Sequence, residues 1–423
     1  MRFGSEVRDV LRAGNVRLLL LAGLVSQTGD WALRIGVGYQ VYALTESTIA
    51  SAVVMLVSLA PQVLLGSVAG AYVDRRDRRR IMVAVNLALA VVLTPLLVAP
   101  DDVVVIYVVL AMSSCLASFF IAADATMLPA MVPDGPLRIT ANALNSQVRD
   151  VSRLVGAALG GALVATGGVA ALAVADMVTF LLAAGAIAVI RHRFSAVPAQ
   201  HVTLRAELVE GFATIRHRRA LMIVLIFLAA TGVGEAIMGT LFAPFVHDLL
   251  AADAGVFGAI VSAQAVGGIL GGVIVSLVGH RFCARTLFGG GAVGFGLLDL
   301  ALFLYPAAFR SVAEAAPPAW PAMVIIAAVG LPGAALVAGF MTTLQNNTTD
   351  PVRGRVFGTV TAAQNGAMLG ATLLAGFAAD TLGIIPLLSA QGAIYVASGL
   401  LVLIALRHDQ RIHAAAEPVT AQL

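Results

Sequence analysis

Charged residues are scarce in this 423-residue chain, at 12%, and lysine is absent, so that all 26 basic residues are arginine. A soluble domain of this length needs more charge to cover its surface. Cysteine is nearly absent too. Cys115 and Cys283 are the two present, which excludes a disulfide-stabilised secreted scaffold. These shortages exclude the soluble globular classes.

Apolar residues are abundant instead, at 60% of the chain, and they fall into long blocks. Each block is long enough to cross a hydrocarbon core of about 30 Å. In lipid the backbone must bond within the chain, as a helix or a closed barrel, and the alternation with a period of two that a barrel needs is absent. We expect an all-α polytopic membrane protein with about twelve transmembrane helices in two pseudo-symmetric six-helix bundles. Only Gly167-Gly168 separates the fifth helix from the sixth.

The arginines gather in alternate loops between these blocks. Arg75 to Arg80 and the arginines of 191–219 lie on one side, whereas the loops of the other side contain Arg310 alone. The positive-inside rule places the arginine-rich loops in the cytoplasm. We therefore expect a multi-pass protein of the bacterial plasma (inner) membrane with both termini cytoplasmic.

The longest arginine-rich loop divides the chain into three parts. Residues 1–190 form the N-terminal six-helix bundle, 191–220 a cytoplasmic linker, and 221–423 the C-terminal six-helix bundle with a short cytoplasmic tail. In the linker Leu204, Leu208, Phe212 and Ile215 recur at helical spacing. This spacing predicts a short amphipathic helix that lies against the cytoplasmic surface or the other half.

Ionisable residues inside the apolar blocks are functional candidates because they are costly in lipid. Asp30 and Arg34 are one helical turn apart and can neutralise each other, so we expect this pair to shape or gate a cavity. Glu235 has no basic residue within a turn or two of its own helix, and we expect it to be the exchangeable proton site. For Asp176 and Asp299 a structural bond to a neighbouring helix is expected.

The acids also mark an internal repeat, because Gly29-Asp30 in the first span has a counterpart, Gly234-Glu235, at a similar depth in the seventh. Gln27 and Gln345 are polar candidates for the same proton and substrate cavity. A cavity with many apolar groups and few polar ones suits amphiphiles rather than sugars.

The most specific local motif is the segment 70–80, which reads Gly-Ala-Tyr-Val-Asp-Arg-Arg-Asp-Arg-Arg-Arg. Gly70 allows a neighbouring helix to approach closely, and Asp74 can accept hydrogen bonds from the N-terminus of another helix. Arg75 and Arg78 can pair with a carboxylate on a neighbour and hold the cytoplasmic gate shut. A solvated positive loop would explain the arginines, but not the glycine and the aspartate at this spacing.

This segment resembles the signature loop of the major facilitator superfamily. In related antiporters an acid on the fourth helix joins the gate, which implicates Asp124. The runs Gly156-Ala157-Ala158-Leu159-Gly160-Gly161 and Arg353-Gly354-Arg355-Val356-Phe357-Gly358 resemble the macrolide-efflux and siderophore-exporter branch. Gly156, Gly160 and Gly161 form a small-residue face for close helix packing.

The resemblance implies a secondary active transporter that exports amphipathic, drug-like molecules by proton-coupled alternating access. Proton-coupled uptake of a small nutrient and export of a siderophore or secondary metabolite are the alternatives. An enzyme is not expected, because it would need a nucleophile with a base or a metal cluster. The seven histidines fall in predicted loops, no two of them form a ligand pair on one helix, and no phosphate-binding glycine loop ends in lysine. The expected partners are a small-molecule substrate, protons and membrane lipid. We expect a monomer without nucleic acid, metal or cofactor.

Overall fold

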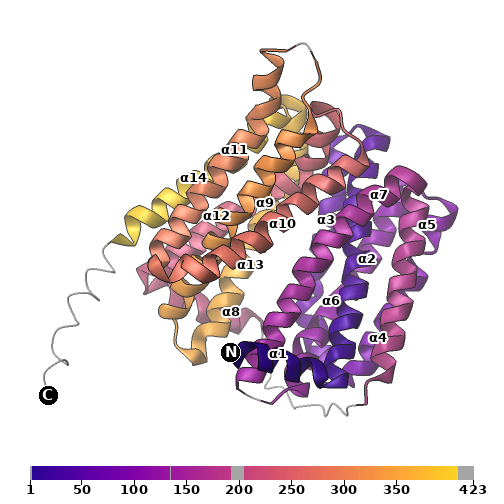
Figure 1. Ribbon diagram of the computed structural model, residues 1–423, viewed down its shortest axis with the longest axis vertical. Helices are drawn as coiled ribbons and strands as arrows, with labels where there is room; N and C mark the ends of the chain where they lie inside the picture. The colour runs from indigo at the N-terminus through magenta and orange to yellow at the C-terminus, as the bar shows by residue number, and fades with distance from the viewer. Residues whose placement is uncertain (1, 134, 192–203, 314, 408–423) are drawn as a thin grey trace, which may run out of the picture. The chain divides into compact units, whose positions relative to one another are not determined.

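The computed structural model describes residues 2–133, 135–191, 204–313 and 315–407, and within these ranges every regular element is a helix (Figure 1). The chain forms two compact units. Unit 1 consists of Met1–His201 with Val246–Ala265, and unit 2 of Val202–Phe245 with Val266–Leu423.

Unit 1 is built around α2, which runs along α7, while α3 packs against α6 and α4 packs against both α6 and α7. Its helices are α1 (Arg2–Arg12), α2 (Gly14–Thr45), α3 (Thr48–Asp74), α4 (Arg78–Val92), α5 (Pro95–Val98), α6 (Val103–Met131) and α7 (Pro136–Val189). Most of the short π-helix η1 (Phe245–Leu249) and the first part of α10 (Ala254–Val278) belong to the same unit.

Unit 2 is built around α9 and α14, with α13 beside α9 and α11 between α12 and α14. Its helices are α8 (Leu204–Arg216), α9 (Arg219–Pro244), the second part of α10, the 3-10 turn η2 (Gly279–Arg281), the π-helix η3 (Thr286–Gly290), α11 (Gly291–Arg310), α12 (Ala319–Asn346), α13 (Asp350–Leu382) and α14 (Ile384–Ala405). Phe227, Phe288 and Phe340 lie in its apolar core.

Two glycines divide long helical stretches at equivalent places. Gly168 interrupts α7 with a φ of 66°, and Gly383 separates α13 from α14 with a φ of 84°. Glycine adopts this region at little cost because it lacks a Cβ atom. The element α7 therefore contains two successive helices, divided where Gly167-Gly168 was expected to divide them.

Nine helices among the described residues are long and apolar enough to cross a membrane, with α7 counted once. The more polar α2 and α13 are not among the nine. Counting α7 as two helices and adding α2 and α13 gives twelve, which is consistent with the expected number.

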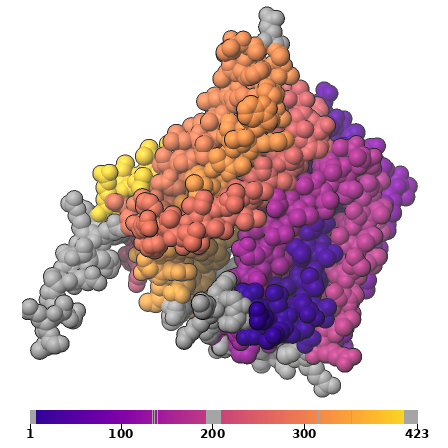
Figure 2. Space-filling model, in the orientation of Figure 1, coloured from indigo at the N-terminus to yellow at the C-terminus, as the bar shows by residue number. Residues whose placement is uncertain are grey.

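Large apolar side chains cover much of the outside of the helices. In unit 2, α11 and α12 expose Leu304, Trp320, Val324 and Val337, and these two helices form part of the face drawn in orange in Figure 2. In water so large an apolar surface would favour aggregation, whereas in a bilayer it faces lipid tails. The exposed surface thus supports the membrane assignment independently of hydropathy.

The linker helix expected near 204–215 lies at α8, which packs against α13 of its own unit. Glu210 forms an ion pair with Arg355 of α13, and Ile215 is fully buried. Phe212 is 49% exposed, so the predicted apolar face is only partly covered by the unit.

Candidate functional site

The central cluster of unit 2 joins two acids from different helices to one face of α14. The Tyr395 hydroxyl donates to Oε1 of Glu235 on α9 at 2.5 Å. One turn earlier on α14, Nε2 of Gln391 donates to Oδ2 of Asp299 on α11 at 2.8 Å. Helix α14 therefore supplies one donor to each acid, and Asp299 makes the bond to a neighbouring helix that was expected of it.

This cluster is enclosed by apolar groups. Asp299 and Gln391 are each 1% exposed, Tyr395 is 6% exposed, and Glu235 is half-buried. The Tyr395 ring lies 4.6 Å from the Phe295 ring, centroid to centroid. Asp299 is thus enclosed by the protein, whereas Glu235 keeps a partly exposed surface.

Among the described residues of α9, α11, α12 and α14, no arginine stands at the depth of the two acids. Neither α12 nor α14 contains a charged residue. Arg219 and Arg310 lie at the ends of α9 and α11. At 1.5 Å per residue, Arg219 is about 24 Å along the helix from Glu235, and Arg310 is about 16 Å from Asp299. The cluster therefore contains acids, a phenol and an amide.

The corresponding cluster of unit 1 does contain a cation. The carboxylate of Asp30 lies 3.9 Å from the guanidinium of Arg34, both on α2. On α7 the Thr179 hydroxyl donates to Oδ1 of Asp176 at 3.0 Å, and Asp176 is 1% exposed. Asp30 and Arg34 are the charged groups that act on Asp176. A guanidinium therefore accompanies the acids of the unit 1 cluster, whereas among the described residues α9, α11, α12 and α14 place none at the depth of the unit 2 cluster.

The two clusters have the same arrangement, in which a glycine on one helix packs against a polar side chain of a later helix. A Cβ atom added at Gly29 would lie 3.1 Å from Cγ of Asp176, and one added at Gly234 would lie 3.2 Å from Cγ of Gln391. Asp176 follows Gly168 at the same spacing at which Gln391 follows Gly383. The internal repeat thus extends from the glycine–acid pairs to the helices they face. At the matched position unit 1 has an acid, Asp176, and unit 2 has a side-chain amide, Gln391.

The remaining cavity candidates are not all near these clusters. Gln27 is half-buried on α2, one turn before Asp30. Gln345 is exposed near the end of α12, where Arg218 donates to the carbonyl of Asn347 at 2.8 Å. That end of α12 lies beside the start of α9, about 25 Å along the helix from Glu235. The structure therefore does not bring Gln345 to Glu235.

The segment 70–80 is fastened to its neighbours through carbonyl groups. Nη1 of Arg78 donates to the carbonyl of Thr126 on α6 at 3.4 Å, and Arg79 donates to the carbonyl of Ala188 on α7. Asp77 caps α4 by accepting from the backbone N–H of Arg80 at 3.2 Å. Arg78 thus bonds a backbone oxygen of α6 here, and its pairing with a carboxylate stays a prediction.

The other residues expected at the cytoplasmic gate have different surroundings. Asp74 is the last residue of α3 and Arg75 follows it. Asp124 of α6 has Asn145 and Arg149 of α7 as polar neighbours. Among the described atoms, none lies within 4 Å of the position of an added Cβ at Gly70, so this glycine makes no close helix contact here.

The glycines of α7 do lie at close helix contacts. A Cβ at Gly156 would lie 2.6 Å from Cβ of Trp31, and one at Gly160 would lie 2.9 Å from Cα of Ala32, both on α2. Gly161 faces α10 instead, and its added Cβ would lie 2.9 Å from Cα of Gly258. These positions let α7 contact a helix on each of two sides.

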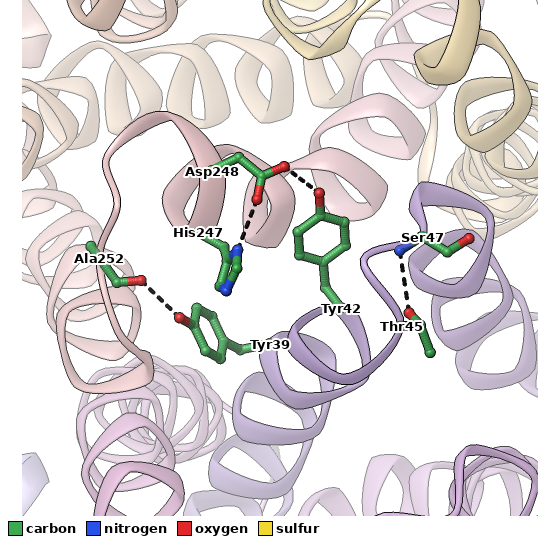
Figure 3. A network of polar contacts seen from close by, with 7 residues as sticks. All are labelled: Tyr39, Tyr42, Thr45, Ser47, His247, Asp248 and Ala252. Carbon is green, nitrogen blue, oxygen red and sulfur yellow. Dashed lines mark hydrogen bonds and ion pairs between the residues drawn. The ribbon is translucent and has the colours of Figure 1, made fainter. Parts of the chain in front are cut away.

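A second polar network within unit 1 joins the end of α2 to η1 and the loop after it (Figure 3). The Tyr42 hydroxyl donates to Oδ2 of Asp248, and the Tyr39 hydroxyl donates to the carbonyl of Ala252 at 2.7 Å. Nδ1 of His247 lies 2.8 Å from Oδ1 of Asp248. The Tyr39 ring also lies 5.5 Å from the Phe257 ring. Hydrogen bonds and ring contacts together hold this end of α2.

Several of these residues were not identified from the sequence. The equal spacing from Gly168 and Gly383 was available as a signal for Gln391. Tyr42 and Asp248 offered none, because they are 206 residues apart and become neighbours only in the fold.

Comparisons with known proteins identify the family. Residues 9–421 match the family model described as transmembrane secretion effector. The multidrug efflux pump Tap of Mycolicibacterium fortuitum is 26% identical over 386 residues, which cover 88% of this chain and 91% of Tap. An uncharacterized MFS-type transporter of Bacillus subtilis (strain 168), YfiS, is 29% identical over 148 residues, or 35% of each chain.

Solved transporters share the fold at low sequence identity. A POT family transporter in complex with a thioalcohol-conjugated peptide has a TM-score of 0.75 at 9% identity, covering 92% of this chain and 95% of its own. A bacterial homologue of the iron transporter ferroportin in an inward-facing state has a TM-score of 0.69 at 16% identity, covering 94% and 98%. The chain therefore belongs to the transmembrane secretion effector family of the major facilitator superfamily, and it is a multi-pass membrane transporter rather than an enzyme.

Proposed function

We propose that this transporter exports amphipathic, drug-like molecules in exchange for protons. The observation that carries the proposal is Glu235, a half-buried acid bonded to Tyr395 in an apolar cluster of unit 2. The similarity to Tap, a multidrug efflux pump, favours drug-like cargo and the export direction.

The contrast between the two clusters favours a proton site in unit 2. In unit 1, the guanidinium of Arg34 lies beside Asp30 and balances the negative charge of the ionised carboxylate. Glu235 is bonded to the Tyr395 hydroxyl and lies near a second acid, Asp299, and an ionised acid within the bilayer is costly. Loss of its proton therefore changes the energy of the site, and this difference can bias one conformation over another.

The other candidate residues take supporting roles in this proposal. Asp30, Arg34 and Gln27 supply polar groups to the substrate cavity, and Gln345 contributes near the cytoplasmic end. Gly70, Asp74, Arg75, Arg78 and Asp124 belong to the cytoplasmic gate. The halves 1–190 and 221–423 alternate in access, joined by the linker 191–220, in an inner membrane with both termini cytoplasmic.

Expression in a drug-sensitive bacterial host tests the proposal. We expect resistance to amphipathic antibiotics that is lost when a protonophore collapses the proton gradient. Glu235→Gln is expected to abolish this resistance, whereas Glu46→Gln, which neutralises an exposed acid after α2, is expected to retain it. Resistance that survives the protonophore would refute proton coupling. Better growth on a limiting nutrient without resistance would indicate uptake instead.

A further inference from the structure

The Asp299–Gln391 pair leaves two buried oxygen atoms without a donor. Nε2 of Gln391 donates to Oδ2 of Asp299, which uses one polar atom of each side chain. Among the described residues, neither Oδ1 of Asp299 nor Oε1 of Gln391 has a hydrogen-bond partner, although both side chains are 1% exposed. If Asp299 were ionised, both atoms would be acceptors, and buried acceptors without donors are rare in folded proteins.

One proton on Asp299 would give both of these oxygen atoms a hydrogen-bond partner. A carboxylic acid and a primary amide are complementary, because each presents one donor and one acceptor side by side. With a proton on Oδ1, Asp299 gains a donor, and Oε1 of Gln391 is the unused acceptor of the same pair. The existing bond from Nε2 to Oδ2 already provides the other half of such an acid–amide pair.

Among the described residues of α11, α12, α14 and η3, no cation stands beside Asp299 to stabilise its ionised form. Two titratable groups interact electrostatically with Asp299: the carboxyl group of Glu235 and the hydroxyl group of Tyr395 on α14. Helices α12 and α14 and the π-helix η3 carry no charged residue, and Arg310 stands at the far end of α11. A second negative charge beside Glu235 would raise the cost of ionising either acid.

We propose that Asp299 is held as a neutral carboxylic acid, paired through both polar atoms with the Gln391 amide, and that it acts as a positioning residue for Glu235. The pair fixes α14 against α11, and Tyr395, one turn further along α14, is thereby kept against Glu235. A neutral Asp299 also leaves Glu235 as the one acid of the cluster whose charge changes. The protonation of Asp299 is inferred from the geometry of the Asp299–Gln391 pair alone. The positioning role of Asp299 toward Glu235 rests on the proposed function.

Infrared spectroscopy of the full-length protein in lipid tests the protonation directly. We expect a carbonyl band of a protonated carboxyl group at neutral pH that is present in the wild type and in Glu235→Gln, and lost in Asp299→Asn. Asp176→Asn is the matched control, because it removes a buried acid of unit 1 and is expected to leave this band in place. An Asp299→Asn spectrum identical to that of the wild type would overturn the proposal.

Transport measurements test the positioning role. Asparagine replaces the neutral acid with a donor and an acceptor, so Asp299→Asn is expected to keep both the rate and the pH profile of transport. Asp299→Leu leaves the Gln391 amide unpaired and is expected to lower the rate and the melting temperature. A folded Asp299→Asn protein with a displaced pH profile would show that Asp299 is ionised and overturn the proposal. If the wild type showed no proton-driven transport, the proposed function would fail, while the infrared band would still decide the state of Asp299.

Discussion

Removal of the Tyr395 hydroxyl is predicted to move the pH dependence of transport to higher pH. The hydroxyl donates to Oε1 of Glu235 at 2.5 Å, and this bond favours the ionised acid. A hydrogen bond to a charged group contributes about 1.5–3 kcal/mol, and we take the lower value because Glu235 is only half-buried. About 1.5 kcal/mol corresponds to roughly a tenfold tighter hold on the proton in Tyr395→Phe. The pH of half-maximal transport is then expected to rise by about one unit.

The assay is substrate flux into or out of proteoliposomes, measured over a series of pH values for the wild type and Tyr395→Phe. Phenylalanine keeps the ring, and with it the contact to Phe295, so packing is preserved. Tyr305→Phe is the matched control, because its hydroxyl donates at 2.9 Å to the carbonyl of Pro318 and not to an acid. A Tyr395→Phe profile that superimposes on that of the wild type, at a normal rate, would refute the assignment of this bond.

Three further predictions concern packing and surface contacts. Gly160→Ala places a methyl group 2.9 Å from Cα of Ala32 on α2 and is expected to lower the free energy of unfolding by about 1–3 kcal/mol. Gly185→Ala, in open space on the second helix of α7, is expected to be neutral or stabilising. Thermal unfolding in detergent compares the two, and equal melting temperatures would contradict the contact. Tyr42→Phe removes the hydrogen bond to Asp248, which contributes about 1 kcal/mol. Amide hydrogen exchange over 245–252 is therefore expected to become roughly fivefold faster, and an unchanged exchange rate would contradict the network. Glu210→Gln breaks an ion pair whose two side chains are 37% and 52% exposed, so the melting temperature is expected to change very little. A decrease in the free energy of unfolding well above about 1 kcal/mol would contradict this expectation.

The helices and the family were predictable because their signals are local. Each apolar block shows its own length, and Gly168 marks the division of α7 within a few residues of sequence. The spacing of Leu204, Leu208, Phe212 and Ile215 is likewise a local pattern, and α8 covers it. Such features need no knowledge of which helices become neighbours.

The partners of the acids were not predictable, because they depend on helix packing. Tyr395 is 160 residues from Glu235, and Gln391 is 92 residues from Asp299. The same limit explains Arg78, for which a carboxylate partner was expected and a carbonyl of α6 is found. Residue type shows that a group needs a partner, but the fold decides which atom supplies it.

Proton-driven flux of Glu235→Gln in proteoliposomes tests the central claim most directly. The full-length protein is reconstituted, a pH gradient is imposed, and flux of an amphipathic substrate is followed for the wild type, Glu235→Gln and Glu46→Gln. We predict that the gradient drives flux in the wild type and in Glu46→Gln, whereas Glu235→Gln binds substrate but shows no response to the gradient. Gradient-driven flux at the wild-type rate in Glu235→Gln would contradict the account.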